Sequence, residues 1–224
     1  MAGYGQFCAV ARALEVLGER WTLLIVRELL LGSTTFTQVS RGLPRIPRAT
    51  LSDRLAKLSA AGLVETSTGG YVLTKSGKAL SPVLEELARW ATDTDAASLR
   101  PDHLDTAALT WDIRRRVDRN ALPDRLVVIE IALADRPAGD RRFWLHLSPS
   151  HVDLCRQDTG APIDLWLSAP IEPVTRWWLG QLSWSDLASR NDVTIRGDRS
   201  LQRQLPTWFQ RYLYTPAYLD RQPH

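Results

Sequence analysis

The spacing of hydrophobic residues in the first part of the chain predicts three helices. Apolar side chains recur at helical spacing through residues 11–32: Leu14, Leu17, Trp21, Leu24, Ile25 and Leu29. Glycine favours helix ends, so Gly18 is expected to divide this segment into two helices and Gly32 to end the second. Residues 34–44 predict a third, short helix with a threonine cap and the apolar pair Phe36 and Val39.

A fourth helix, within residues 45–62, has one apolar and one basic face. Leu51, Leu55 and Leu58 share the apolar face. The residues that fall largely off that face carry cations or hydroxyls: Arg48, Thr50, Ser52, Arg54 and Lys57. The helix dipole favours acids at an N-terminus, so a basic start indicates that this end faces an external partner.

The third and fourth helices are joined by a tight turn at residues 42–44 that contains glycine and proline, and together they predict a helix-turn-helix. The pattern then alternates over residues 63–73 around Gly69-Gly70, which predicts a β-hairpin. A hairpin in this place is a wing. Residues 75–91 predict one more amphipathic helix, with the stripe Leu80, Leu84, Leu87 and Trp90. Such a stripe beyond a compact domain needs a partner, so this helix is a candidate dimer helix.

The second part of the chain alternates between helical and strand patterns. Helices are expected at residues 106–120, 170–191 (split at Ser183) and 199–213, the last with the apolar face Leu201, Leu205, Trp208 and Phe209. Strand-forming runs occur at residues 125–135, 141–147, 151–155, 163–169 and 192–198. The fold class predicted for the whole chain is α+β: an N-terminal winged helix, then a sandwich of one five-stranded sheet with helices on one side.

Charge and tryptophan content change near the polar stretch before Pro101. Residues 1–92 hold 11 Lys/Arg and 7 Asp/Glu, a balance of +4, and the rest of the chain holds 17 and 18, a balance of −1. Two tryptophans precede residue 93 and seven follow it. We therefore expect two domains, at residues 1–95 and 104–224, joined by a linker at residues 96–103.

Composition narrows the class of protein further. The length of 224 residues fits one or two domains, and no apolar run approaches the roughly 20 residues that span a bilayer. The two cysteines, Cys8 and Cys155, are too few for a disulfide framework. With no signal-peptide pattern visible, a cytoplasmic protein with no membrane association is expected.

The basic helix has the chemistry of a DNA reader. Lys and Arg contacts to phosphates supply much of the affinity, and the first residues of a recognition helix face base edges. Arg can pair with guanine, and a Thr methyl can meet thymine. The candidate DNA-binding residues are Thr35, Arg45, Arg48, Ala49, Thr50, Ser52, Arg54 and Lys57. The alternative is an ordinary solvent-facing helix, but the basic cluster falls on the one helix that a winged-helix layout reserves for DNA.

Residues 7–92 resemble the HxlR-type winged-helix transcriptional regulators. The matching pieces are a Cys near the start, "GERWTLLIVRELLLG", "GLPRIPRATLSDRLAKLSAAGLV" and "YVLTKSGKALSPVL" followed by Trp90. The resemblance implies a homodimer, formed through the N-terminal helix and the Leu80–Trp90 helix, that places two recognition helices on a near-palindromic operator. The chain departs from the family pattern in two places: Ala9 follows the cysteine where many members have proline, and the hairpin lacks a basic, proline-containing tip.

Residues 104–213 resemble the sterol carrier protein type 2 domain. The features shared are a strand that ends in a small residue, a helix with "WWLG", a short helix, and the strand "VTIRGD" before a last helix. The resemblance implies an apolar cavity between sheet and helices that holds a lipophilic ligand. The candidate ligand-binding residues are Trp111, Trp144, Trp166, Trp177, Trp178 and Trp184. The alternative for any one of these rings is simple core filling.

Other chemistry has weaker support in the sequence. His146, His151, Asp153 and Cys155 are of metal-ligand types, but their spacing matches no recurrent zinc site. The run Arg114–Arg116 is a possible phosphate patch, but consecutive helix residues point in different directions, which favours a solvated face. No nucleophile–base pair, phosphate loop or cofactor motif stands out, so neither an enzyme nor a cofactor is expected.

The favoured hypothesis is a homodimeric regulator that binds operator DNA and senses a hydrophobic small molecule through its C-terminal domain. One alternative is a thiol-based redox regulator that acts through Cys8, with a structural or dimerising C-terminal domain. Some relatives in the family that residues 7–92 resemble sense oxidants through the matching cysteine, and the nearby Arg12 would favour its thiolate. Another alternative is that the second half of the chain is a lipid-handling or enzymatic module, which the first half only positions.

Overall fold

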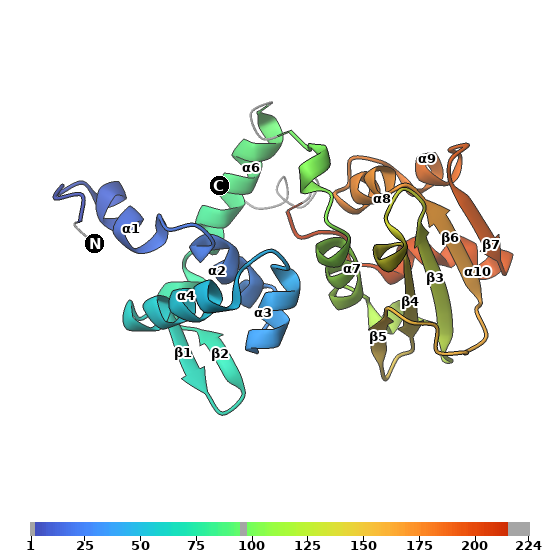
Figure 1. The fold of residues 1–224 in the computed structure, drawn as a ribbon, viewed down its shortest axis with the longest axis horizontal. Coiled ribbons are helices and arrows are strands. Elements are labelled where there is room, and N and C mark those ends of the chain that lie inside the picture. Colours follow the sequence, from blue (N-terminus) through green and yellow to red (C-terminus); the bar gives the residue numbers. More distant parts are fainter. Residues whose placement is uncertain (1–2, 95–97, 215–224) are drawn as a thin grey trace. The chain divides into compact units, whose positions relative to one another are not determined.

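The computed structural model describes residues 3–94 and 98–214, and the chain divides into two compact units, Met1–Trp90 and Ala91–His224 (Figure 1). Residues 96 and 97 of the expected linker lie outside the described residues. The remainder of that linker includes a 3-10 helix, η2 (Pro101–His103).

The first unit contains a helix-turn-helix followed by a two-stranded wing. Its elements are α1 (Ala9–Leu17), α2 (Thr22–Leu30), α3 (Phe36–Gly42), α4 (Arg48–Ala60), β1 (Val64–Ser67), β2 (Gly70–Leu73), α5 (Lys75–Lys78) and α6 (Ser81–Asp93). This order confirms the predicted winged helix. The single helix expected at residues 75–91 is wrong, since α5 and α6 are separate. Pro82 lies in the first turn of α6, and its missing N–H and its ring would disrupt a helix continued from Lys78.

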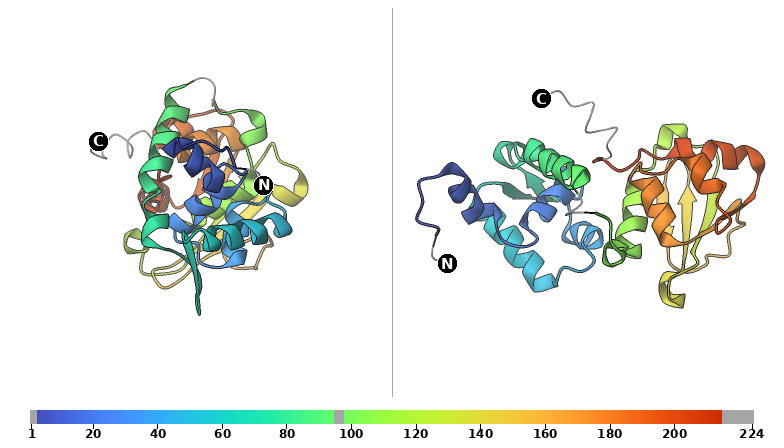
Figure 2. Two further views of the ribbon diagram at one scale, coloured as in Figure 1. Left: turned by 90° about the vertical axis from the view of Figure 1, so that its left-hand side faces the viewer. Right: turned by 90° about the horizontal axis from the view of Figure 1, so that it is seen from above.

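The core of the first unit excludes α1. The predicted leucine stripe of α4 is buried, and α4 packs against α2 and β1. Ile25 and Val26 of α2 and Val39 of α3 are likewise inaccessible to solvent. None of the residues of α1 is buried, and this helix lies at the margin of its unit in Figure 1 and in the right-hand view of Figure 2. Burial of apolar area stabilises the fold, so α1 contributes little to the stability of a single chain.

The second unit is built on one mixed sheet. Its elements are α7 (Thr106–Arg115), η3 (Arg119–Ala121), β3 (Val127–Leu133), η4 (Ala138–Asp140), β4 (Arg142–Leu147), β5 (Val152–Cys155), β6 (Leu165–Ala169), α8 (Ile171–Trp178), α9 (Trp184–Ala188), β7 (Thr194–Gly197), α10 (Arg199–Gln204) and η5 (Leu205–Trp208). The strand order is β5-β4-β3-β6-β7; β3 and β6 are parallel, and the other neighbours are antiparallel. The α+β prediction with five strands is confirmed.

The last predicted helix is shorter than expected. It ends at Gln204, turns into η5, and leaves Phe209 in an extended conformation. Pro206 accounts for the difference, since proline cannot donate the backbone hydrogen bond that an α-helix needs. The four apolar residues predicted for this segment are nevertheless buried.

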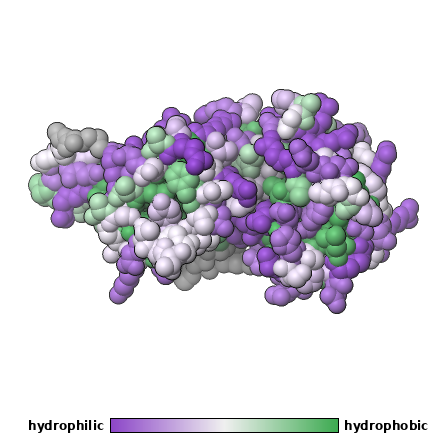
Figure 3. Space-filling model, turned by 60° about the horizontal axis from the view of Figure 1, so that its bottom comes forward, coloured by the Kyte–Doolittle hydropathy of each residue, from purple (hydrophilic) through white to green (hydrophobic). Residues whose placement is uncertain are grey.

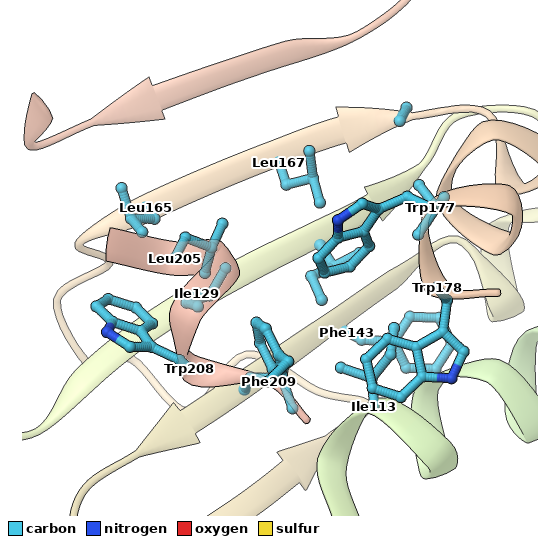
Figure 4. Close-up of a cluster of buried hydrophobic side chains, with 14 of the residues drawn as sticks. Ile113, Ile129, Phe143, Leu165, Leu167, Trp177, Trp178, Leu205, Trp208 and Phe209 are labelled. Atoms are coloured by element: carbon cyan, nitrogen blue, oxygen red, sulfur yellow. The ribbon is translucent and has the colours of Figure 1, made fainter. Parts of the chain in front are cut away.

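One face of the sheet, which we call the helix-covered face, forms the core of the second unit. Side chains of α7, α8, α9, α10 and η5 pack there against alternate sheet residues such as Ile129, Phe143 and Leu165. Figure 4 shows Trp208 and Phe209 among these side chains. The intervening sheet residues, among them Glu130 and Trp166, point to the opposite face, which we call the open face.

The arginine run of α7 is bound to the protein, and the predicted solvated face is therefore wrong. Arg114 lies 5.2 Å from the ring centroid of Trp111 and donates to the carbonyl of Val152. Arg115 pairs with Asp112, and Arg116 donates to the carbonyls of residues 210 and 211. The C-terminal segment and β5 lie against α7, so tertiary structure supplies acceptors that helix geometry alone does not reveal.

Within residues 3–94 and 98–214, none of the helices is long and apolar enough to cross a membrane. Polar side chains dominate the face drawn in Figure 3, where apolar side chains form small separate patches.

Candidate nucleic-acid interface

The helix-turn-helix is held by a cap at its first helix. Thr35 Oγ1 accepts the N–H of Gln38 at 3.2 Å, and Gln38 Oε1 accepts the N–H groups of Thr34 and Thr35 in return. This capping box satisfies backbone donors at the start of α3. Thr35 is exposed, but its side-chain oxygen is already an acceptor in the cap.

The start of α4 is exposed and basic. Pro47 is the N-cap, and the first turn contains no acid. The Arg48 guanidinium carbon lies 5.1 Å from the ring centroid of Phe36 on α3, a cation–π contact that supports the side chain. Ala49 and Ser52 are exposed beside it, and Thr50 is half-buried. The opposite face of α4 is the leucine stripe, so this end of the helix is presented outward by core packing.

Arg45 lies in the turn before α4 and is exposed. Arg45 is three residues before Arg48, and both are exposed at the start of α4. The structure thus groups Arg45, Arg48, Ala49 and Ser52 at one end of the basic helix.

Arg54 and Lys57 are held in an ion-pair cluster with Glu19 and Asp53. Arg54 pairs with both carboxylates, donates to the carbonyl of Arg20 at 3.3 Å, and leaves 17% of its side chain exposed. Lys57 Nζ lies 3.0 Å from Glu19 and 3.2 Å from Asp53. The hydrogen bonds that Lys57 donates to these carboxylates, chiefly the one to Glu19, raise its pKa. Two cations face two carboxylates, so the cluster has no net charge to offer to phosphates.

Sequence reasoning missed Glu19 and Phe36 as supports of the basic helix. The Asp53–Lys57 pair has i,i+4 spacing and could be read locally. Glu19 lies between α1 and α2, far from α4 in sequence, and only tertiary packing brings it to Lys57.

The wing is anchored beside the helix-turn-helix. The N–H of Tyr71 donates to the carbonyl of Thr34 at 2.6 Å, directly before α3. Gly70 has φ 117°, and a Cβ there would overlap the same carbonyl, so this close approach requires glycine. Residues 64–73 contain no Lys or Arg, and the exposed tip presents the hydroxyls of Ser67 and Thr68.

The six candidate tryptophans lie in different parts of the second unit. The ring centroid of Trp177 lies 5.3–6.0 Å from those of Trp178, Trp184 and Phe209, in tilted or edge-on arrangements within the helix-covered core. Trp111 lies on α7, under the Arg114 guanidinium. Trp144 and Trp166 are on the open face. The sheet therefore separates two of these rings from the core cluster, and the six do not line one pocket.

Cys8 is exposed at the N-cap of α1. The backbone N–H groups of Ala11 and Val10 lower the pKa of its thiol; the cause is the start of the helix and not the guanidinium of Arg12. Cys155 is half-buried on β5, and burial followed by the charge of Asp153 raises the pKa of its thiol.

The metal-ligand types of the β4–β5 hairpin are brought together in part. His146 pairs in register with Asp153, and Cys155 Sγ lies 4.0 Å from Asp153 Oδ2, whereas His151 lies at the turn. No group of three His, Cys, Asp or Glu side chains within the described ranges could hold a metal ion.

Comparison with known proteins places the first unit in a family context. The profile of the HxlR-like helix-turn-helix matches residues 16–98. The Bacillus subtilis protein named uncharacterized HTH-type transcriptional regulator YvaP is 38% identical over 89 residues, which cover 37% of this chain and 82% of YvaP. The chain spans between 58% and 82% of the lengths of four such curated relatives.

Two solved structures are each similar to part of the chain. Quinone-bound YodB from Bacillus subtilis is 33% identical, with a TM-score of 0.36, and the match covers 38% of this chain and 97% of YodB. The UbiJ-SCP2 ubiquinone synthesis protein is 12% identical, with a TM-score of 0.31, and covers 60% of this chain and 96% of its own. The name of this second protein includes SCP2, the domain that residues 104–213 resemble.

Proposed function

This chain belongs to the HxlR-like helix-turn-helix family of transcriptional regulators, and we propose that it binds near-palindromic operator DNA as a homodimer. The observation that carries the proposal is the exposed basic start of α4. Arg48 is supported by Phe36, no acid lies in the first turn, and the opposite helix face is buried. This is the end of a recognition helix that reads base edges in the major groove.

The roles of the basic residues differ within this proposal. Arg48, Ala49, Thr50 and Ser52 contact base edges, and Arg45 contacts phosphate. Arg54 and Lys57 already have carboxylate partners, so a phosphate would have to compete with Glu19 and Asp53 for them. Arg48 is therefore the residue whose loss weakens operator binding most.

Selection from a random duplex pool with the full chain identifies an operator, and fluorescence anisotropy at fixed salt then measures its affinity. Loss of a bidentate base contact costs about 1–3 kcal/mol, or about 5–150-fold in affinity, and we expect this of Arg48→Ala. Arg203→Ala, an exposed change in the other unit, serves as the matched charge control. Failure to enrich any sequence, or equal affinity of the two variants, would refute the proposal.

Two unpartnered apolar surfaces support the homodimer. Val10, Leu14 and Val16 are exposed on α1, a helix with no buried residue. On α6, Leu84 packs into its own unit, whereas Val83, Leu87 and Trp90 are exposed at i, i+4 and i+7. Exposed apolar patches of this kind mark interaction sites, and a second copy of the chain would bury them.

Sedimentation equilibrium of the full chain tests the dimer. The expected species is twice the chain mass of 25.2 kDa. Leu87→Asp should produce monomers, because it places a charge in the proposed interface. Glu85→Gln, about half a turn round the helix axis from the exposed apolar row, keeps the acceptor for Ser81 and should leave the dimer intact. A monomeric wild-type chain at micromolar concentration would refute this part.

The second unit is proposed to bind a small hydrophobic effector. Such a ligand changes DNA binding only if it binds the DNA-competent and incompetent dimers with different affinity. Coupling of about 1–3 kcal/mol would change operator affinity about 5–150-fold. The connection from α6 into the second unit is the proposed bistable element, because this segment of the chain links the two units. Native mass spectrometry of the purified chain tests for a co-purified apolar compound.

A thiol switch at Cys8 is a second candidate function. Cys8 is exposed, and its lowered pKa increases the share of reactive thiolate relative to an ordinary cysteine. In this alternative an oxidant joins two Cys8 thiols across the dimer. A non-reducing gel after mild oxidation should show a cross-linked dimer that Cys8→Ser abolishes and Cys155→Ser retains. No cross-link in the wild-type chain would eliminate this candidate.

A further inference from the structure

The open face of the sheet carries a row of rings and charges at one register position. Trp144 pairs with Glu130, Glu130 with Trp166, and Trp166 with Arg196. Paired residues of neighbouring strands stand side by side on the same face, with Cβ atoms about 5 Å apart. The row therefore alternates ring, carboxylate, ring and guanidinium across four strands.

A pocket of about 540 Å³ opens over the part of this row from Glu130 to Arg196, and Trp144, which is buried, lies outside it. Trp166 and Arg196 line it together with Glu130, Arg142, Ser168 and Thr194. Its volume lies in the range of about 300–1,000 Å³ typical of small-molecule sites. All of its lining belongs to the second unit, and it is separated by the sheet from the aromatic core around Trp177.

The charges in the pocket leave one cation available. Glu130, with 14% of its side chain exposed, lies 3.6 Å from Arg142 Nε, so these two compensate each other. Arg196 is exposed and makes no hydrogen bond or ion pair with any residue in the described ranges 3–94 and 98–214. The pocket therefore has a net positive charge beside Trp166, a residue that is 40% exposed.

We infer that this pocket binds small aromatic carboxylates. The ligand ring packs on Trp166, since aromatic pairs gain more than area burial alone. Its carboxylate accepts hydrogen bonds from the Arg196 guanidinium, whose fork matches a carboxylate. The hydroxyls of Ser168 and Thr194 supply further donors along the same wall. This inference rests on the proposed function in one respect: it names the class of effector that the second unit senses.

Isothermal titration of the full chain with 1-naphthoate tests the site, and the neutral 1-naphthalenemethanol is the comparison ligand. Arg196→Gln should weaken naphthoate binding about tenfold, because it removes a charge-assisted hydrogen bond, and leave the alcohol unchanged. Trp166→Leu should weaken both ligands. Arg199→Gln changes an exposed arginine outside the pocket by the same charge and should change neither.

No binding of naphthoate, or equal binding by wild type, Arg196→Gln and Trp166→Leu, overturns the site. Arg196 is exposed, so Arg196→Gln should not unfold the protein. Circular dichroism of the variant checks that its fold is unchanged. Operator binding by the wild-type chain is measured separately, without naphthoate. If the chain binds no operator in that measurement, the proposed function is refuted, but the inference about the pocket is not. Naphthoate that binds the pocket without changing operator affinity overturns its assignment as the effector site.

Discussion

Gly42, the last residue of α3, lies against a fully buried carboxylate, and Gly42→Ala is expected to destabilise the DNA-binding unit. An added Cβ would overlap Glu28, with all three of its nearest atoms within 2.9 Å. Glu28 cannot easily yield, since Oε1 accepts from Arg27 Nη2 at 2.7 Å and Ser33 Oγ lies 3.5 Å from Oε2. The carboxylate would have to leave these donors to make room.

The expected cost follows from two physical terms. Overpacking a filled site costs about 1–3 kcal/mol, and a hydrogen bond to a charged group contributes about 1.5–3 kcal/mol. The two are not independent, so we expect a loss of about 2–4 kcal/mol from the free energy of unfolding. For a unit of this size, each kcal/mol lowers the melting temperature by about 4–8 °C, and the fall should be at least about 8 °C.

Native-state hydrogen exchange, resolved by mass spectrometry, is the appropriate measurement, because two units in one chain would blur a single melting transition. Amides of α2, α3 and α4 should lose protection, and amides of the second unit should keep theirs. Gly139→Ala is the matched control, since an added Cβ there has no atom within 4 Å.

The double variant Glu28→Ala with Gly42→Ala separates the overlap from the loss of the carboxylate. If the overlap is the cause, the double variant costs less than the sum of the two single ones. Protection in Gly42→Ala equal to that in Gly139→Ala would refute the reasoning. So would strict additivity in the double variant.

Three further predictions follow from contacts elsewhere in the chain. Asp112→Ala removes the buried acceptor that lies 2.7 Å from Trp178 Nε1 and breaks the ion pair with Arg115. The free energy of unfolding should fall by about 3–5 kcal/mol, measured as lost exchange protection in α7, and a fall below about 1 kcal/mol would contradict the prediction. Iodoacetamide at pH 7.5 should alkylate Cys8 before Cys155, because the pKa of the first thiol is lowered and that of the second raised; equal rates by mass spectrometry would disagree. Glu19→Gln removes one negative charge beside the cations of α4, so binding to non-specific duplex at low salt should tighten and its salt dependence steepen; unchanged titrations would mean that the cluster faces away from DNA.

Local pattern was sufficient for most of the secondary structure. The leucines of α4 are buried where helical periodicity puts them, and five alternating runs became five paired strands. In residues 199–213 the sequence contained a helix-ending residue, Pro206, but the apolar spacing outweighed it in the prediction. The spacing favours one helix over the whole segment, whereas the helix ends at Gln204.

The candidate sites were predicted less completely than the fold. The exposed basic start of α4 follows from the sequence alone, because the leucine face of the helix must be buried and the opposite, charged face must then lie in solvent. The partners of Arg54 and Lys57 do not follow, since Glu19 approaches them only through packing of α2 on α4. The tryptophans show the same limit, because composition cannot say which face of a sheet each strand presents.

By itself, the sequence determined the order of helices and strands, the winged helix, the division of charge between the two parts of the chain, and the family. These depend on periodicity and on neighbouring residues, which are local. Tertiary structure alone decided which cations are compensated, which carboxylate requires glycine at residue 42, and which side chains meet across the strands to form the pocket at Trp166. Those contacts join residues distant along the chain, and their energies depend on burial and on distances of a few ångströms that no local pattern specifies.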